Sequence, residues 1–431
     1  MLFTIWPFAG HVNPNMAIAQ ALKSRGHDVA VYSGGQVRKA FEREDFRFFP
    51  FKRVDEAGLK EMLLSERATL SPLLHPRRRV TILKSWLVDT LSDQIADQTE
   101  VLRAWQPDAI VSDVTMWGVP LILKHTQGVP VAVSTFVPGC MIAGPDAPPF
   151  GLGLPLPHNL PTRLLSKAVK TITGAAARSL RGQVNKIRHL HGLSPLPCDV
   201  QTFLGNMELY LVPCTPQFDY SRRDLPDSVR YVGDLVWNKH SSDPPPDWLA
   251  RLPTDRAIVH VTEGTMHSRP FVLQAAAEGL AHRNMYVVMT SGRDRDPESL
   301  NLPPLAPNIR IESWVPHSDL LPRTDVMVTT GGGGTIVAGL QAGVPMVVVP
   351  TQWDKPDNAQ RVVEAGVGLR IGPRRCTPQR LRDAVEHILG NESFREKAKL
   401  ASSAMRSYGG PARAAVLIEE MLNHRSSDGV G

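Results

Sequence analysis

Four consecutive glycines, Gly331–Gly334, follow an apolar stretch at 326–328 and precede a helix-like stretch that starts at Thr335. Glycines let backbone N–H groups come close to a ligand, because no side chain stands in the way. A helix behind them directs the positive end of its dipole at the same place. This order suits a diphosphate, although a glycine run taken alone is equally consistent with a flexible loop.

Polar side chains follow the next apolar stretch, which covers residues 345–349. Asp354, Asp357 and Asn358 carry carboxylate and amide groups that can bind hydroxyl groups. The sequence therefore predicts a place for a polyhydroxylated group beside the diphosphate candidate.

A histidine and an aspartate each follow an apolar strand in the first half of the chain. His11 comes after the first strand, with Asn13 predicted as the N-cap and Pro14 as the first residue of the next helix. Asp113 ends a later strand. A histidine can act as a general base, and an aspartate bonded to its ring N–H stabilises the imidazolium. Taken alone, His11 is more often a turn histidine that bonds the backbone, and Asp113 a strand-end cap, but two matching positions in one sheet favour a pair.

Two further strand ends carry suitable groups in the second half of the chain. Gly264 and Thr265 follow one strand, and their backbone and hydroxyl suit a phosphate oxygen. Trp314 ends another strand, where an indole can stack on a nucleotide base, although a tryptophan at a strand end is equally often part of the core.

Apolar stretches of strand length alternate with helix-period segments along most of the chain, which predicts an α/β fold with parallel sheets. The predicted strands cover 2–8, 28–33, 46–51, 109–113, 129–135, 209–214, 229–235, 257–264, 285–292, 308–315, 326–332, 345–350 and 368–371. The polar, Pro-rich stretch at 238–247 reads as a linker, and the pattern restarts after it. Ligands bind beyond the carboxyl ends of such strands.

We therefore predict an N-terminal domain over 1–235, a linker over 236–247 and a second domain over 248–410. Residues 411–431 are expected to form a helix that packs back across the domains, followed by a tail.

Composition excludes several classes of protein. The chain has 431 residues, a net charge of +6 and no Lys/Arg tract denser than HPRRR at 75–79, so nucleic-acid binding is not expected. Its four cysteines form no CxxC pair, and HExxH, GxSxG and GxxxxGK[ST] are absent, which disfavours zinc sites, α/β-hydrolases and P-loop enzymes. Asp294-Arg295-Asp296 resembles a metal-nucleotide DxD motif, but its polar surroundings indicate a solvated loop.

No apolar run approaches the length needed to cross a membrane, and no signal-peptide pattern precedes the first strand. We expect a soluble cytoplasmic protein without integral membrane association.

Together these motifs resemble the family 1 glycosyltransferases, in particular their bacterial natural-product or macrolide branch. The matching segments are GHVNP at 10–14, WVPH at 314–317, TTGGGGT at 329–335 and PTQWDKPDNAQ at 350–360. Their order and spacing match over nearly the whole chain. The resemblance implies the GT-B fold, in which two Rossmann-like, doubly wound domains face a cleft, the first binding the acceptor and the second the nucleotide-sugar donor.

The resemblance also implies an activity, which is inverting, metal-independent transfer of a sugar from a dTDP- or UDP-linked donor to a hydroxyl of a hydrophobic natural product, as in antibiotic biosynthesis. His11 would act as the general base and Asp113 would support it. The residues expected at the donor are Gly264, Thr265, Trp314, Val315, Thr330, Gly331, Gly332, Gly333, Gly334, Thr335, Asp354 and Lys355. The residues expected at the acceptor are Phe8, Trp86, Phe136, Met141 and Phe150. No metal and no cofactor besides the nucleotide-sugar is implied.

Three positions depart from the family pattern. Thr330 stands where the family usually has a histidine that contacts the diphosphate, Ala338 where it has a ribose-binding glutamate, and Lys355 where it has glutamine. The missing glutamate leads to the hypothesis that the donor carries deoxyribose, which lacks the 2′-hydroxyl, so that a dTDP-sugar is preferred.

Two other functions remain open at this point. A sugar-nucleotide epimerase or a phosphorylase would keep the fold, but the His11–Asp113 pair suits deprotonation of an acceptor hydroxyl better. A non-catalytic, auxiliary nucleotide-sugar-binding protein would explain the lost histidine and glutamate, but it would not need the pair. The sequence leaves open whether the chain forms a homodimer.

Overall fold

The computed structural model describes residues 1–64, 76–220, 222–237, 245–264, 269–292 and 295–428. The predicted donor residue Thr265, Asp294 of the DxD-like triplet and most of the predicted linker lie outside these ranges.

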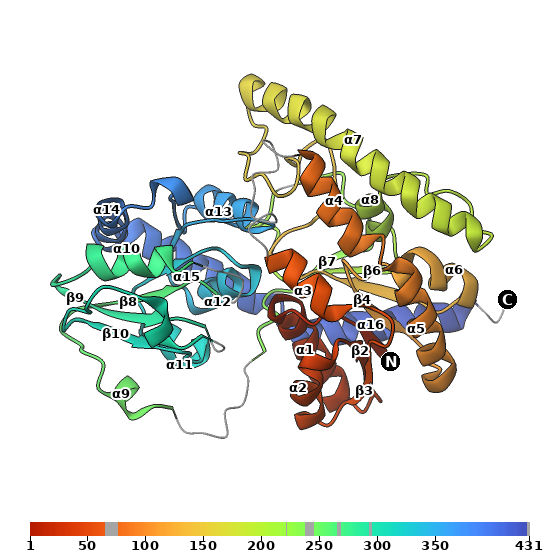
Figure 1. Cartoon of the computed structure of the whole chain (residues 1–431), viewed down its shortest axis with the longest axis horizontal. Coiled ribbons are helices and arrows are strands. Elements are labelled where there is room, and N and C mark those ends of the chain that lie inside the picture. The colour runs from red at the N-terminus through yellow and green to blue at the C-terminus, as the bar shows by residue number, and fades with distance from the viewer. Residues whose placement is uncertain (65–75, 221, 238–244, 265–268, 293–294, 429–431) are drawn as a thin grey trace.

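Two parallel sheets organise the described part of the chain, one of seven strands and one of six (Figure 1). The first has the order β3-β2-β1-β4-β5-β6-β7, and the second has the order β10-β9-β8-β11-β12-β13. The strands are β1 Leu2–Thr4, β2 Ala30–Ser33, β3 Arg47–Pro50, β4 Ile110–Asp113, β5 Val131–Ser134, β6 Leu209–Val212, β7 Val229–Tyr231, β8 Ala257–Thr262, β9 Met285–Thr290, β10 Ile309–Glu312, β11 Val326–Thr329, β12 Met346–Val348 and β13 Gly368–Arg370. Each lies inside a stretch predicted as a strand, and the predicted α/β class is confirmed.

Helices cover the faces of both sheets. They are α1 Ala9–Ser24, α2 Arg38–Arg43, α3 Glu56–Leu64, α4 Pro76–Leu87, α5 Leu91–Trp105, α6 Lys124–Gln127, α7 Leu160–Leu190, α8 Val200–Gly205, α9 Asp247–Ala250, α10 Phe271–Gly279, α11 His317–Leu320, α12 Gly333–Ala342, α13 Lys355–Glu364, α14 Pro378–Leu389, α15 Glu392–Ser407 and α16 Gly410–Asp428. In β1, Leu2 belongs to one buried hydrophobic cluster and Phe3 to another. Successive side chains of a strand point to opposite faces, so the first sheet is buried on both sides, as parallel sheets generally are.

Helix α1 begins earlier than predicted, at Ala9, so the assignment of Asn13 as N-cap and Pro14 as the first helical residue is wrong. The N–H groups of His11 and Val12 both donate to the carbonyl of Phe8, at 2.8 and 2.9 Å, and this closes the first turn before Pro14 is reached. A proline at this depth removes one helical hydrogen bond. His11 therefore stands in the first turn of a helix rather than in a loop.

The last helix, α16, returns to the first sheet instead of staying with the second (Figure 1). Its Ala415 and Ile418 share a buried hydrophobic cluster with Phe3 of β1. Glu419 accepts hydrogen bonds from Arg25, at 2.6 Å, and pairs with His27 at 2.8 Å. The end of the chain thus ties the two halves of the molecule together.

Within the described ranges, no helix is both long and apolar enough to cross a membrane.

Candidate active site

His11 and Asp113 lie in contact at the carboxyl edge of the first sheet. Nδ1 of His11 is 2.8 Å from Oδ2 of Asp113, and both side chains are buried. The other carboxylate oxygen of Asp113 accepts hydrogen bonds from the backbone N–H of Thr115, at 2.8 Å, and from the Thr115 hydroxyl. The aspartate is therefore fixed by its own chain before it orients the imidazole.

This contact also selects the protonation pattern of the ring. An ionised carboxylate can only accept, so it holds the proton on Nδ1 and leaves Nε2 as a lone-pair nitrogen. The pair thus has the chemistry of a general base and the group that supports it.

Aromatic rings surround the imidazole. The ring centroids of Phe136, Phe8 and Trp86 lie 3.8, 5.7 and 6.1 Å from that of His11. The structure thus brings three of the five predicted acceptor residues to the histidine. Of the other two, Met141 lies in the hydrophobic core, and Phe150 is more than a third exposed.

Trp353 joins this aromatic group from the second half of the chain, although sequence reasoning gave it no role. Its ring meets Trp86 edge-on at 5.8 Å, and the guanidinium of Arg79 lies 3.9 Å above it. Trp353 has a φ of +63°, which is rare for a bulky residue and tends to occur at functional sites. The available signal was its place in the WDKPDNAQ segment.

The predicted diphosphate loop connects β11 to α12. Gly331 has a φ of +87°, a conformation that favours glycine. A Cβ built on Gly332, Gly334 or Gly264 would meet no atom within 4 Å, so these three residues border open space. The N-terminal end of the ten-residue helix α12 therefore borders that space, and such a helix end can bind an anion.

Gly333 does not border this open space. It lies against the backbone of Phe136, which connects the glycine loop to His11. A Cβ at Gly333 would lie 2.5 Å from the carbonyl oxygen of Phe136, so only glycine permits the approach of the two backbones. The ring of the same Phe136 packs against that of His11. One residue of the first domain thus contacts both the base candidate and the glycine loop, which places them in a single site.

Two predicted donor residues direct their side chains away from this space. Val315 is buried in a small hydrophobic cluster with Ile258 and Leu320. Thr330 is buried, and its hydroxyl donates to the carbonyl of Glu263 at 2.7 Å, so this hydroxyl is engaged within the protein. Trp314 and Thr335 are half-buried beside their strand and helix ends.

Charged groups are buried beside the glycine loop. Asp354 and Lys355 are both less than a tenth exposed, and Asn358 donates to Asp354, at 2.7 Å, and to the carbonyl of Gly331. Burial lowers the pKa of Lys355 to about 8, against the opposing effect of the Asp354 and Glu263 carboxylates. Burial raises the pKa of Asp354, against the opposing effects of the Lys355 charge and of the hydrogen bond from Asn358.

Asp357 has a different place from the one predicted. Its two carboxylate oxygens accept hydrogen bonds from the N–H groups of Gly151 and Gly153, both at 2.6 Å. Arg370 donates to the carbonyl of Gly153 at 2.7 Å. Asp357 therefore fastens a loop of the first domain onto α13 and does not offer its oxygens to a sugar.

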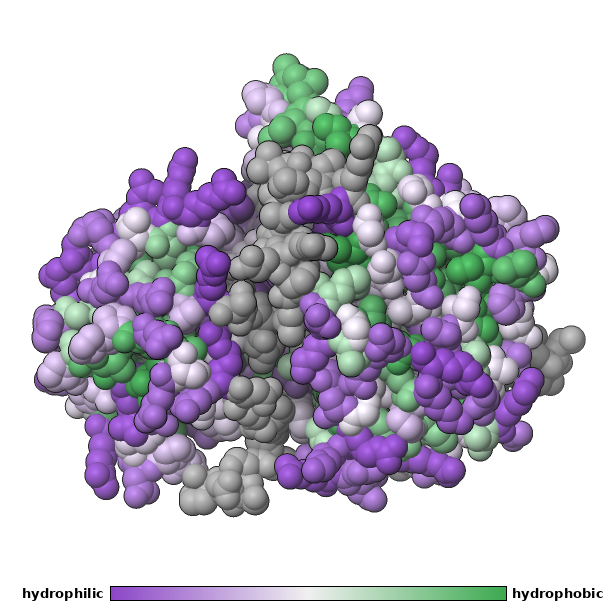
Figure 2. Space-filling model, viewed as in Figure 1, coloured by the Kyte–Doolittle hydropathy of each residue, from purple (hydrophilic) through white to green (hydrophobic). Residues whose placement is uncertain are grey.

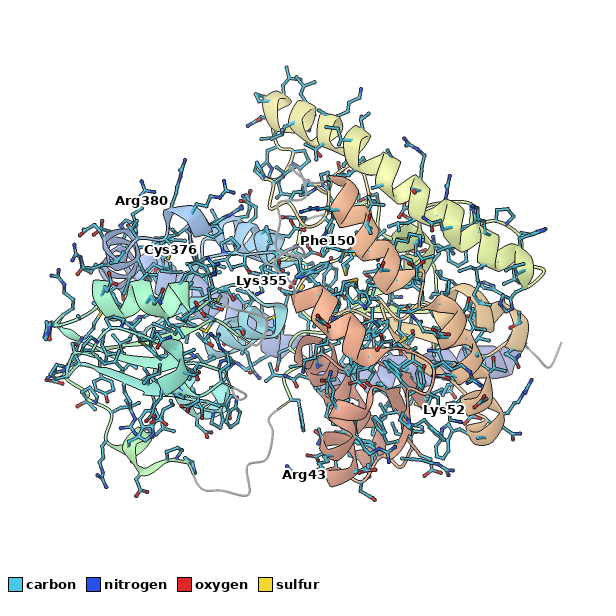
Figure 3. All side chains as sticks on the ribbon, in the orientation of Figure 1. Arg43, Lys52, Phe150, Lys355, Cys376 and Arg380 are labelled. Carbon is cyan, nitrogen blue, oxygen red and sulfur yellow. The ribbon has the colours of Figure 1, made fainter. Side chains whose placement is uncertain are left out.

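A buried ion pair strengthens the same junction. Nε of Arg361 is 2.9 Å from Oδ1 of Asp219, with both side chains nearly inaccessible to solvent. Figure 3 shows Lys355, the first residue of α13, and Phe150 of the first domain in the region between the two domains. The two domains are held against each other by α13.

Alternative sites find no support in the described residues. No group of His, Cys, Asp or Glu side chains there can hold a metal ion, and all four cysteines are free thiols. Arg295 of the DxD-like triplet is 3.6 Å from the buried Glu263, so it is not simply a solvated residue as expected. A surface hollow of about 650 Å³ between α5 and α7 is lined by Ser92 and Lys186, away from His11.

Comparisons with known proteins agree with this geometry. Residues 278–421 match the family described as erythromycin biosynthesis protein CIII-like, C-terminal domain. The chain is 32% identical over 404 residues to 4′-demethylrebeccamycin synthase from Lentzea aerocolonigenes, covering 92% of this chain and 93% of that protein.

Solved structures share the fold. The glycosyltransferase of kitacinnamycin matches with a TM-score of 0.72 and 23% identity, over 97% of this chain and 98% of that one. The spinosyn rhamnosyltransferase has been solved with spinosyn aglycone and with thymidine diphosphate; in the latter form it matches with a TM-score of 0.70 and 20% identity, over 97% and 99% of the two chains. With the extensive match to the rebeccamycin enzyme, these likenesses lead to one conclusion: the chain belongs to the family 1 glycosyltransferases, in their macrolide and natural-product branch, and is a glycosyltransferase of the GT-B fold.

Proposed function

We propose that this enzyme transfers a sugar, with inversion, from a dTDP-sugar to a hydroxyl group of a hydrophobic natural-product aglycone. One observation carries the proposal: Phe136 contacts the buried His11–Asp113 pair with its ring and the glycine loop with its carbonyl oxygen. A base and an anion cradle in one site are what this reaction requires.

His11 starts the reaction in this mechanism. The acceptor hydroxyl donates to Nε2 of His11, and Nε2 takes its proton while Nδ1–H stays bonded to Asp113. The oxygen then bonds to the anomeric carbon, and the bond from that carbon to the donor diphosphate breaks. The base lies on the opposite side of the sugar from the leaving group, so the configuration inverts.

The glycine loop stabilises the leaving group. Backbone N–H groups at Gly332 and Gly334 and the N-terminus of α12 face the diphosphate and offset its charge as the bond breaks. This removes the need for a metal ion in the step. Asp354 is the residue we assign to the sugar hydroxyls, and Trp314 to the base of the nucleotide.

The acceptor lies against the aromatic group. Phe8, Trp86 and Phe136 of the first domain and Trp353 of the second present flat apolar surface around His11. Such a lining favours a hydrophobic aglycone. We accordingly assign acceptor binding to residues 1–235 and donor binding to residues 248–410.

The preference for dTDP follows from Ala338. This residue of α12 is buried in the hydrophobic core, and its methyl side chain offers no oxygen to a ribose hydroxyl. The spinosyn rhamnosyltransferase, which shares the fold, has been solved with thymidine diphosphate. A donor without a 2′-hydroxyl loses nothing at such a site.

Matched donors test the proposal. The wild-type enzyme is given dTDP-glucose or UDP-glucose with a panel of polycyclic and macrolide aglycones, and release of the nucleoside diphosphate is measured. We expect a higher kcat/KM with the dTDP donor, and a β-linked product from the α-linked donor by NMR. A clear preference for UDP-glucose contradicts the donor assignment, and an α-linked product contradicts inversion.

A further inference from the structure

Helix α7 is rich in basic residues. Its 31 residues contain no Asp or Glu, and its Lys and Arg residues are Arg163, Lys167, Lys170, Arg178, Arg181, Lys186 and Arg188. The whole chain has 48 basic and 42 acidic residues, so without these seven the acidic residues outnumber the basic ones by one. Helix α7 thus contributes seven positive charges that no acidic residue of the same helix offsets.

The same helix exposes large apolar side chains. Leu160, Leu164, Leu165 and Ile172 are 70%, 58%, 45% and 60% exposed. Figure 1 places α7 along the rim of the first domain, and Figure 2 shows hydrophobic surface gathered at its upper end. Scattered exposed leucines are ordinary, but four within 13 residues form a patch that has to be explained.

Helical spacing puts the apolar and basic groups side by side. Leu164, Ala168 and Ile172 follow one another every four residues and so lie along one exposed face. Arg163 and Lys167 each precede a member of this row by one position, which places them along its edge. The opposite face attaches the helix to the domain through buried residues such as Val169.

Part of the basic charge of α7 is available to a partner. Lys170 donates to the carbonyl of Gly144 at 2.6 Å, and Arg188 to that of Ser194 at 2.8 Å. The exposed Arg163 also donates to the carbonyl of Pro157, at 3.1 Å. Lys167, Arg178 and Lys186 are exposed.

The positive charge of α7 distinguishes between two possible partners, a second copy of the chain and an anionic lipid surface. A second copy of the chain would bring two basic helices together, which repel each other. A surface of anionic lipid meets both requirements, since its headgroups pair with Lys and Arg while leucine side chains enter the boundary with the acyl chains.

We propose that the exposed face of α7 docks this enzyme on anionic membranes. The attachment is peripheral and reversible. It brings the enzyme to the surface in which hydrophobic small molecules concentrate, but it does not depend on which acceptor the active site takes.

Vesicle sedimentation tests the inference. The full chain is mixed with vesicles of phosphatidylglycerol and phosphatidylcholine in equal parts, or of phosphatidylcholine alone, and the bound fraction is measured at 50 and 500 mM NaCl. We expect binding to the anionic vesicles only, and a loss of at least tenfold in affinity at high salt.

Variants locate the surface. Leu164→Gln with Ile172→Gln, and separately Arg163→Glu with Lys167→Glu, are each expected to weaken vesicle binding at least tenfold. Leu400→Gln and Lys399→Glu are the matched controls, because Leu400 is 70% exposed on α15 and Lys399 is its exposed neighbour. Circular dichroism and the thermal midpoint establish that each variant is folded.

Three outcomes overturn the inference. Wild-type protein that ignores the anionic vesicles shows that lipid is not the partner, and a folded α7 variant that binds as well as wild type shows that this face is not used. Control variants that lose binding as strongly as the α7 variants show that the attraction is not specific to this helix.

Discussion

The His11–Asp113 side of the site and the glycine-loop side are prepared in different ways. The first consists of side chains that are already bonded to each other, at 2.8 Å, and anchored through Thr115. The second consists of backbone: Gly332 and Gly334 border open space, and the nearby Thr330 hydroxyl is occupied by a carbonyl group.

This contrast reflects what each side has to do. A base must keep one ring nitrogen in one orientation, which a buried carboxylate achieves. A diphosphate carries charge on several oxygens, and peptide N–H groups can approach it more closely than long side chains can. Substitutions on the His11–Asp113 side should therefore lower kcat, whereas substitutions on the glycine-loop side should weaken donor binding.

The largest effect is expected at His11. His11→Ala removes the base and should lower kcat by about 10²-fold or more, with little change in the KM of the donor. The measurement is initial rate against donor concentration at saturating acceptor.

Asp113→Asn is the companion variant. It keeps the shape of the pair, but its amide favours the wrong tautomer of the His11 ring. It should also lower kcat rather than raise KM. An unchanged kcat in folded His11→Ala would remove this histidine from the mechanism.

The second-largest effect is expected at Lys355, on the glycine-loop side, and concerns the pH dependence of stability. Burial holds its pKa at about 8, against an ordinary value of about 10.4, so the unfolded chain binds more protons between these pH values. Stability rises with pH where the unfolded state binds more protons. Between pH 8 and 10.5, the wild type should therefore gain about 3 kcal/mol in free energy of unfolding relative to Lys355→Gln.

Urea unfolding of both proteins at a series of pH values measures this difference. A stability difference that does not change over this range would show that Lys355 titrates normally.

The smallest and most specific effect compares two neighbouring glycines. Gly334→Ala places a methyl group in open space, so it should stabilise the helix by about 0.5–1 kcal/mol while raising the KM of the donor several-fold. Gly333→Ala forces a methyl group against the Phe136 carbonyl and should destabilise the protein by about 1–3 kcal/mol.

Thermal unfolding and donor kinetics together distinguish the two variants. If Gly334→Ala left donor KM unchanged, the open space beside it would not be the diphosphate site.

Local pattern was enough to predict the strands. The central strands, such as β1, β4 and β11, are short apolar runs that are buried on both faces of a parallel sheet, and such runs are visible without any knowledge of their neighbours. The position of His11 and Asp113 at strand ends followed from the same pattern, because the carboxyl ends of parallel strands share one edge.

Local pattern failed where distant parts of the chain meet. Asp357 was expected at a sugar, but it binds the amides of Gly151 and Gly153, about 200 residues earlier in the chain. Nothing near Arg361 in the sequence indicates Asp219 as its partner. The start of α1 was missed for a smaller reason, since the Phe8 carbonyl closes the first turn without a side-chain cap.

The sequence by itself determined the two sheets, the strand-end residues that carry chemical groups and the glycine loop, because these depend on burial period and on backbone freedom at single residues. Only the tertiary structure decided that Phe136 contacts both His11 and Gly333, that Trp353 enters the aromatic group with a φ of +63°, and that α7 leaves leucines exposed among basic residues. These arrangements depend on how the two domains and a long helix pack, and packing between distant segments leaves no periodic trace in the chain.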